Sequence, residues 1–271
     1  MKFVIGISTM NDGIHALYER VSKIKENVTI IICHQITNDI DYDYKKYAHP
    51  NIKIYSKREK GLSKSRNVLL QGARENEADY IIISDDDVDY ELNNLMIFKA
   101  HVESNQDFLA HYQFKSSDLT GKDRKNYPSK QYELGIVDIF KVSSIEMCLN
   151  MKLLEIANIS FDEKFGLGGR YPVGEEAVLL ADIKENKQKI IFVPIAITIH
   201  PVESTGVLLF TQPLMVLSRG AMFKRCFGAF TGFIMLILFW FKKFMFKKGE
   251  SGKISGPQAL SLLIKGFKDS E

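Results

Sequence analysis

The stretch Tyr80-Ile81-Ile82-Ile83-Ser84-Asp85-Asp86-Asp87 decides the fold class of this chain. Residues 80–83 form a short apolar run, which predicts a buried strand leading directly into three aspartates. Adjacent carboxylates repel one another, so at the end of a buried strand they call for a compensating cation. Hard ions such as Mg²⁺ or Mn²⁺ are held by one or two carboxylates together with substrate phosphates. A solvated acidic loop or a helix N-terminus is the alternative explanation for the cluster.

Similar apolar runs predict further strands on the N-terminal side of this one. They cover residues 3–7, 28–33 and 52–55, and helical spacing is found at 15–24 and 63–73. Strands that alternate with helices predict a parallel α/β sheet, in which ligands bind at the carboxyl ends of the strands. The polar loops Ser8–Gly13 and Ser84–Asp89 should therefore lie on one edge of the sheet.

The middle of the chain is less regular. The pattern predicts strands at 107–114, 136–142 and 190–194, the last continuing as extended chain to residue 200, and helices at 144–154 and 177–185. The polar stretch 115–131 is predicted to be a mobile loop.

Composition excludes several classes of protein. The chain has 271 residues with a net charge of +3, which gives no support for nucleic-acid binding. Its three cysteines are far apart, so a disulfide framework or zinc site is not expected and a reducing compartment is favoured. The N-terminal segment resembles a strand more than a signal peptide, so we expect the chain to begin in the cytoplasm.

A change of composition near residue 205 predicts a domain at 1–205 and a C-terminal apolar and basic helical extension at 206–271. Residues 226–241 carry no charge and are flanked by lysine and arginine on both sides. A spanning helix needs about 20 apolar residues, so an amphipathic or re-entrant segment on an anionic membrane surface fits better. A buried core helix is the alternative. A short helix is expected at 257–267.

Two further constellations carry possible chemistry. In Lys60–Asn67 a glycine precedes a helix start with cations in its first turn, which suits a bound anion; Arg66 could reach a phosphate or brace the aspartates, and an ordinary surface helix is the alternative. In Phe161–Glu176 a glycine-rich loop leads to Glu175 and Glu176 at a helix start, where an ionised carboxylate is a candidate general base. Acidic residues are also common at helix starts for purely structural reasons.

His200 follows an extended apolar run and precedes a proline. A metal or phosphate ligand and a structural histidine are both open interpretations of this residue.

These motifs, taken in order, resemble those of the family 2 glycosyltransferases. Ile7-Ser8-Thr9-Met10-Asn11 looks like the opening strand and nucleotide loop, Gly61–Asn67 resembles the G-x-[ST]-x-[AS]-R-N segment, and Ile83–Asp87 resembles the DXD region. Phe161–Gly166 through Gly174-Glu175-Glu176 resembles the acceptor loop and base motif. The resemblance covers roughly residues 1–205 and implies the GT-A fold, a Rossmann-like, mostly parallel central sheet flanked by helices.

The resemblance also implies roles for individual residues. Asp87 would hold the divalent metal, and Asp85 or Asp86 would contact the ribose or share the metal. Glu176 would be the catalytic base with Glu175 beside it in the acceptor site. The remaining assignments are Ser8 and Thr9 in the nucleotide pocket, Arg66 near the nucleotide, and His200 at the metal or diphosphate.

Two positions depart from the family pattern. The acidic pair is Glu-Glu where Glu-Asp is familiar, and the second strand ends in Cys33-His34-Gln35 where many relatives have an acidic residue. Gln35 could hydrogen-bond the base instead.

The implied function is inverting transfer of a sugar from a nucleoside-diphosphate sugar, with a UDP-sugar favoured. The acceptor would be a glycan or a polyprenyl-diphosphate-linked glycan in cell-surface polysaccharide synthesis, at the inner face of the plasma membrane. A nucleotidyltransferase is one alternative, but residues 8–13 lack the Gly-rich, Lys/Arg-bearing loop expected there. A non-catalytic protein that binds sugar nucleotides or a partner enzyme is another.

Overall fold

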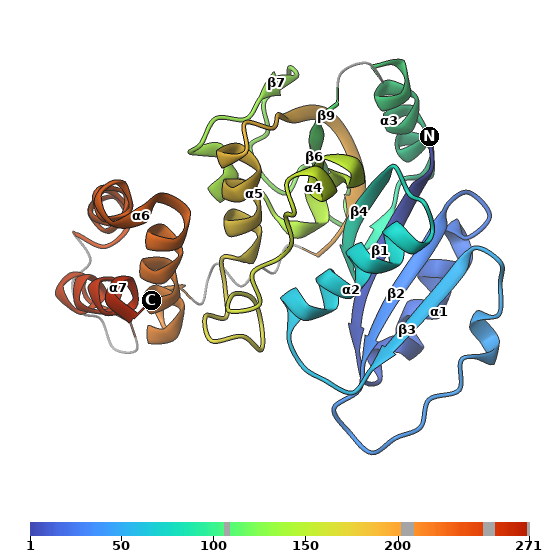
Figure 1. The fold of residues 1–271 in the computed structure, drawn as a ribbon, viewed down its shortest axis with the longest axis horizontal. Coiled ribbons are helices and arrows are strands. Elements are labelled where there is room, and N and C mark those ends of the chain that lie inside the picture. The colour runs from blue at the N-terminus through green and yellow to red at the C-terminus, as the bar shows by residue number, and fades with distance from the viewer. Residues whose placement is uncertain (106–108, 202–208, 246–252, 270–271) are drawn as a thin grey trace. The chain divides into compact units, whose positions relative to one another are not determined.

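The computed structural model describes residues 1–105, 109–201, 209–245 and 253–269 (Figure 1). The chain divides into two compact units. The first contains Met1–Lys60, Lys64–Ser160 and Ile183–Val202, and the second contains Gly61–Ser63, Phe161–Asp182 and Glu203–Glu271. The second unit thus includes two segments from the N-terminal 205 residues. The domain boundary near residue 205 stays a prediction.

The first unit is built on one mixed sheet. Its strands are β1 (Phe3–Met10), β2 (Thr29–Gln35), β3 (Ile52–Lys57), β4 (Tyr80–Asp85), β5 (Asp89–Tyr90), β6 (His111–Ser117), β7 (Tyr132–Glu133), β8 (Met147–Asn150) and β9 (Ile190–Ile199). They follow the order β3-β2-β1-β4-β8-β6-β9-β5, and β7 also pairs with β9. Strands β3, β2, β1 and β4 are parallel, as predicted, whereas β8 runs antiparallel to both β4 and β6.

Helices cover both faces of this sheet (Figure 1). The helices before the C-terminal extension are α1 (Gly13–Ile24), α2 (Leu62–Glu75), α3 (Leu92–Ser104), α4 (Met151–Ile156) and α5 (Glu175–Glu185). The apolar sides of α1 and α3 share one core with alternate residues of β1, β2, β4 and β6. Helix α2 lies on the opposite face, because a Cβ built at Gly6 of β1 would stand 3.2 Å from Cβ of Leu69. Close packing of α2 on the sheet therefore needs glycine at residue 6.

Several predictions for the middle of the chain are wrong. The helix predicted at 144–154 is a 3₁₀ turn, η3 (Ser144–Glu146), followed by β8 and the short α4. The apolar run in β8 is buried between β4 and β6, so pairing with its neighbours overrides the helical pattern. The strand predicted at 136–142 is the 3₁₀ turn η2 (Asp138–Lys141), where only Ile139 is buried. Residues 107–108 of the strand predicted at 107–114 lie outside the described residues, and β6 begins only at His111.

The stretch predicted to be a mobile loop is held by a buried carboxylate. Its first residues continue β6, and further along Lys125 Nζ lies 2.7 Å from Oε1 of the fully buried Glu146. The Tyr127 hydroxyl donates to the same carboxylate oxygen at 2.8 Å, and its ring stacks on Phe192. These contacts fix the segment against the sheet.

The second unit contains helices α6 (Pro213–Lys243) and α7 (Gly256–Asp269). Helix α7 confirms the helix predicted at 257–267, and the uncharged run 226–241 lies within α6. A Cβ at Gly220 of α6 would collide with the backbone carbonyl of Leu263, and one at Gly266 of α7 with that of Leu217. The two helices therefore pack through reciprocal glycines. By length and composition, α6 is long and apolar enough to cross a membrane.

Candidate functional site

The polar loops after β1 and β4 lie at the same edge of the sheet, as predicted. Strands β1 and β4 are parallel neighbours, with Ser8 directly opposite Asp85. One residue further along each strand, Thr9 Oγ1 donates a 2.6 Å hydrogen bond to Oδ2 of Asp86. The strand register therefore brings the predicted nucleotide loop and the acidic cluster together.

Each aspartate of the cluster has its own partner. Asp85 Oδ1 lies 3.4 Å from Nη2 of Arg66, and Asp86 accepts from Thr9. Asp87 Oδ2 lies 3.1 Å from Nε2 of His200. The protein itself therefore supplies a partner to each aspartate, so adjacency alone is no argument for a bound cation.

The environments of the last two aspartates shift their pKa values in opposite directions. Burial raises the pKa of Asp86, and the charges of Asp87 and Asp85 add to this, while the hydrogen bond from Thr9 opposes it. The hydrogen bond from His200 lowers the pKa of Asp87, and the same contact raises the pKa of His200. Asp87 is therefore the member of this pair that is held in its ionised form.

A glycine at the first position of α1 makes room for Asp86. A Cβ built at Gly13 would collide with Oδ2 of Asp86 and would stand 2.7 Å from Oγ1 of Thr9. The carboxylate therefore lies close against the N-terminus of α1, where the helix dipole favours negative charge. The sequence pattern did not predict this contact, because Gly13 is the last residue of the predicted loop and lies two residues before the helix predicted at 15–24.

The N-terminal part of α2 is tied to the same edge of the sheet. The Arg66 side chain is almost completely buried and reaches Asp85, which is one of the two contacts that the segment Gly61–Asn67 suggested for it. Ser65 Oγ donates a 2.8 Å hydrogen bond to Oγ of Ser8. Ser144 Oγ donates to Oδ2 of Asp85 at 3.3 Å. Neither serine was singled out from the sequence; Ser65 could have been, since it lies beside Arg66 in the motif.

The end of β2 contributes a buried histidine. Gln35, the predicted base-reading residue, is the last residue of β2 and is buried opposite Met10. Next to it, His34 Nε2 lies 2.9 Å from the Asn11 carbonyl and Nδ1 lies 2.7 Å from the Tyr44 hydroxyl. Burial lowers the pKa of His34, so the neutral ring donates to Asn11 and accepts from Tyr44. This hydrogen bond fixes the loop after β1.

The acidic pair lies in the second unit at the first turn of α5. Glu175 is buried and Glu176 is partly exposed. Gly174 precedes them with φ +105, and a Cβ there would stand 3.1 Å from Cγ and Sδ of Met222 in α6. A Cβ at Gly166 would stand 3.3 Å from Cδ of Glu175. Glycine at both positions therefore lets the loop and α6 pack closely around the pair.

Arg219, which the sequence pattern showed only as part of the basic flank of residues 226–241, lies near this pair. The Nε of Arg219 in α6 is buried and has no hydrogen-bond partner, and Nη1 lies 3.5 Å from Sδ of Met222. Burial lowers the pKa of Arg219, while the charges of Glu176 and Glu175 oppose that change. A cation therefore faces the candidate base within the second unit.

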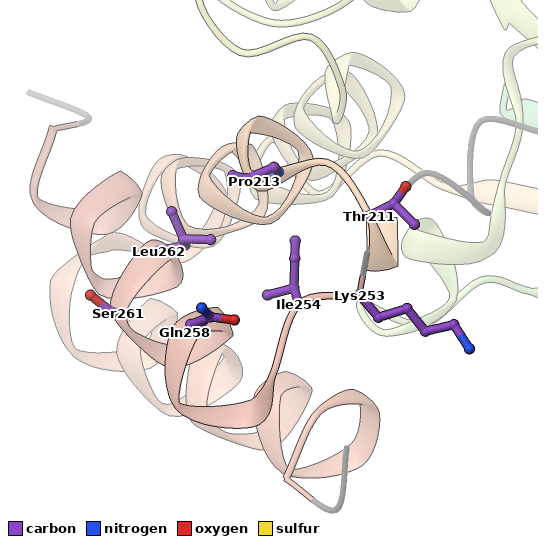
Figure 2. A pocket seen from close by; sticks show the side chains of 7 residues that line it. All are labelled: Thr211, Pro213, Lys253, Ile254, Gln258, Ser261 and Leu262. Atoms are coloured by element: carbon purple, nitrogen blue, oxygen red, sulfur yellow. The ribbon is translucent and has the colours of Figure 1, made fainter. Parts of the chain in front are cut away.

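Within the described ranges, no three His, Cys, Asp or Glu side chains lie close enough together to hold a metal ion by themselves. A hollow of about 480 Å³ lies between the start of α6 and α7 (Figure 2). In Figure 2, Ile254 points toward Pro213, whereas Lys253 points away from Leu262. None of the predicted site residues lines this hollow.

The sheet order, with a parallel β3-β2-β1-β4 half followed by the antiparallel β8, and an acidic cluster at the end of β4, defines the GT-A fold. Among solved structures, the chain is similar to crystal structures of S. aureus TarS, a GT-A glycosyltransferase. Against TarS 1–349, 98% of this chain matches 81% of that one, with 17% identity and a TM-score of 0.67. For the same TarS fragment in complex with UDP-GlcNAc, 98% of this chain matches 82% of that one, with 16% identity and a TM-score of 0.68.

A longer TarS structure matches 82% of this chain with 17% identity and a TM-score of 0.58, and this chain spans only 39% of its length. At these identities the likeness concerns the fold. No protein-family model and no curated protein matches the chain.

Proposed function

We propose that this protein is an inverting glycosyltransferase that uses a nucleoside-diphosphate sugar. The observation that carries the proposal is the junction of β1, β4 and α2, where Ser8, Thr9 and Arg66 meet the aspartates at the carboxyl edge of a GT-A sheet. In such sheets ligands bind at this edge. The nucleotide-sugar site consists of Ser8, Thr9, Gln35, Arg66, Asp85 and Asp86. A UDP-sugar is the favoured donor, since a TarS structure of the same fold contains UDP-GlcNAc.

The residues present fit a divalent ion that is bound together with the donor. The candidate ligands are Asp87, Asp85 and His200, which do not lie close enough together to form a complete protein cage, and Mg²⁺ is usually held by one or two carboxylates plus phosphate oxygens. The Pro201 carbonyl lies 2.7 Å from Nδ1 of His200, which orients the ring with Nε2 toward Asp87. When bound, Mg²⁺ or Mn²⁺ would neutralise charge on the diphosphate leaving group.

Glu176 is proposed as the base that activates the acceptor. Its partly exposed carboxylate takes the proton from an acceptor hydroxyl, whose oxygen then attacks the anomeric carbon as the nucleoside diphosphate leaves. One displacement of this kind inverts the anomeric configuration. The buried Glu175 supports its neighbour in the acceptor site, and the Arg219 charge attracts both carboxylates.

The acceptor is proposed to be a glycan or a polyprenyl-diphosphate-linked glycan. The basic and apolar composition of α6 supports an enzyme at an anionic membrane, peripheral on the cytoplasmic face of the plasma membrane.

The donor proposal is tested by thermal unfolding with a panel of nucleotide sugars, with Mn²⁺ or with a chelator. A UDP-sugar at 100 times its Kd should stabilise the fold by about 2.7 kcal/mol. Asp87→Asn should abolish the Mn²⁺-dependent part of the shift. If no nucleotide sugar changes the unfolding temperature, with or without metal, the donor proposal is wrong.

The base proposal is tested by Glu176→Gln, with Glu185→Gln in the last turn of the same helix as the matched control. Glu176→Gln should reduce transfer by about 10²–10⁴-fold while leaving donor binding intact. Full transfer activity in this variant would eliminate Glu176 as the base.

A further inference from the structure

Helix α6 is interrupted at one residue. Gly228 has φ 70 and ψ −171, which is not helical, so a first segment (213–227) and a second segment (229–243) differ in direction. At 1.5 Å per residue the second segment is roughly 22 Å long. The hydrocarbon core of a bilayer is about 30 Å thick, so neither segment crosses it as a straight helix.

One side of the second segment is packed within its own unit. A Cβ at Gly232 would stand 2.5 Å from the Phe223 carbonyl oxygen, and the Phe223 and Phe239 rings lie 5.4 Å apart. Trp240 Nε1 donates a 2.7 Å hydrogen bond to the carbonyl of Gly256 at the start of α7. The orientation of the second segment about its axis is therefore fixed.

The opposite side carries an apolar stripe made of Phe230, Ile234, Leu238 and Phe241. Their exposed fractions are 81%, 45%, 59% and 52%. The spacing of four, four and three residues places them along one side of the helix. Exposing such large side chains in a row is unfavourable in water, and rows of this kind mark interaction surfaces.

The charges around the stripe identify what it contacts. Lys242 and Lys243 follow it and are exposed. Of the basic residues that the structure describes in α6, Arg219 lies near the acidic pair of α5 and Arg225 is paired with Asp182, so Lys242 and Lys243 are the exposed, positively charged residues next to the stripe. A second copy of this chain would bring the same positive charge against itself, whereas an anionic lipid surface would neutralise it.

We propose that the second segment of α6 lies flat on an anionic bilayer. The apolar stripe enters the boundary between headgroups and acyl chains, and Lys242 and Lys243 contact the lipid phosphates. The role of this membrane contact rests on the proposed function, because it would hold the enzyme where a lipid-linked acceptor is presented. The membrane contact itself can be tested without transferase activity.

The test is flotation of the full chain with vesicles of phosphatidylcholine, alone or mixed with phosphatidylglycerol. Binding is expected only with the anionic lipid and should weaken with salt. The triple variant Phe230→Ser, Ile234→Ser, Leu238→Ser should bind about 100-fold more weakly, because three large apolar side chains no longer leave water. The matched control is Ile97→Ser with Met96→Ser, which removes exposed apolar side chains from α3 and should bind as the parent does.

The orientation is tested separately by adding a second tryptophan to the parent, which keeps Trp240 and its hydrogen bond to Gly256, and the fluorescence of the parent is subtracted. Phe230→Trp and Phe241→Trp should be quenched equally by a spin label near the lipid headgroups. Unequal quenching would show a tilted or spanning helix and would overturn the flat arrangement.

Two other outcomes would overturn the proposal: undiminished binding by the triple variant, or a dimer in solution that the triple variant converts to a monomer. Donor binding is measured in the same samples without vesicles. Loss of donor binding with intact flotation would refute the proposed function and leave the membrane surface standing.

Discussion

The buried His111 leads to a prediction about how the free energy of unfolding depends on pH. It begins β6 with its side chain fully buried. Nε2 lies 2.8 Å from Oε1 of Gln188, and Nδ1 accepts from the backbone N–H of Asn150 at 3.2 Å. The Gln188 amide is oriented by its own 2.8 Å hydrogen bond to the Leu153 carbonyl. The site therefore accommodates only the neutral ring with its proton on Nε2.

Burial lowers the pKa of His111 from 6.5 to about 4. In the unfolded chain the ring binds a proton near pH 6.5, whereas in the folded protein it does so only near pH 4. Above pH 6.5 the ring is neutral in both states, so the pKa difference leaves the free energy of unfolding unchanged. As the pH falls, the unfolded state binds the proton first and is stabilised relative to the folded state. The folded state should lose about 2 kcal/mol at pH 5 and about 3 kcal/mol at pH 4 through this residue.

The measurement is urea unfolding of the parent protein and of His111→Gln at a series of pH values. Glutamine can donate and accept hydrogen bonds but does not titrate. Other groups titrate in both proteins, so the difference between the two curves reports His111. His101→Gln on α3, where the ring is less buried, controls for loss of a histidine. Parallel curves for the parent and His111→Gln between pH 7 and 4 would refute the argument.

Three further substitutions test the packing and the charges. Gly220→Ala should destabilise the protein by about 1–3 kcal/mol in urea unfolding, because its Cβ would meet the backbone of α7, whereas Gly135→Ala has room and should be neutral. Lys125→Met leaves the buried Glu146 carboxylate without its cation and should cost about 3 kcal/mol; Lys130→Met on the exposed loop is the control. Asp86→Asn should leave the melting temperature unchanged or raise it at pH 7, because burial opposes the charge of Asp86 and an asparagine oxygen still accepts from Thr9; a lower melting temperature would contradict this.

The parallel half of the sheet was predictable because its strands are buried on both faces. Residues 80–83 form an uninterrupted apolar run, and the structure extends this strand to Asp85. The acidic cluster begins at the last residue of this strand. Helix α3 was missed because Met96 and Ile97 are exposed although apolar, which blurs the period of its buried Leu95, Phe98 and Val102.

Strand β8 could not be predicted from local sequence. Met147-Cys148-Leu149-Asn150 is equally compatible with a helix, and only the edges of β4 and β6 select the extended form. The same limit applies to the candidate site. The motif around Arg66 pointed to the aspartates, but Ser144 and Arg219 are contributed by segments whose positions depend on the completed fold.

The sequence singled out Asp87 as the metal ligand and left Asp85 and Asp86 interchangeable, and the three aspartates have different surroundings in the structure. Asp86 accepts a hydrogen bond from Thr9 and lies against Gly13, so its carboxylate holds the loop after β1 close to the N-terminus of α1. Asp85, one of the two residues expected to contact the ribose, lies next to the positively charged Arg66. Asp87 is the most exposed of the three and is kept ionised by His200. A group that must exchange one partner for a cation and a diphosphate has to be accessible and charged, and of the three aspartates Asp87 meets both conditions.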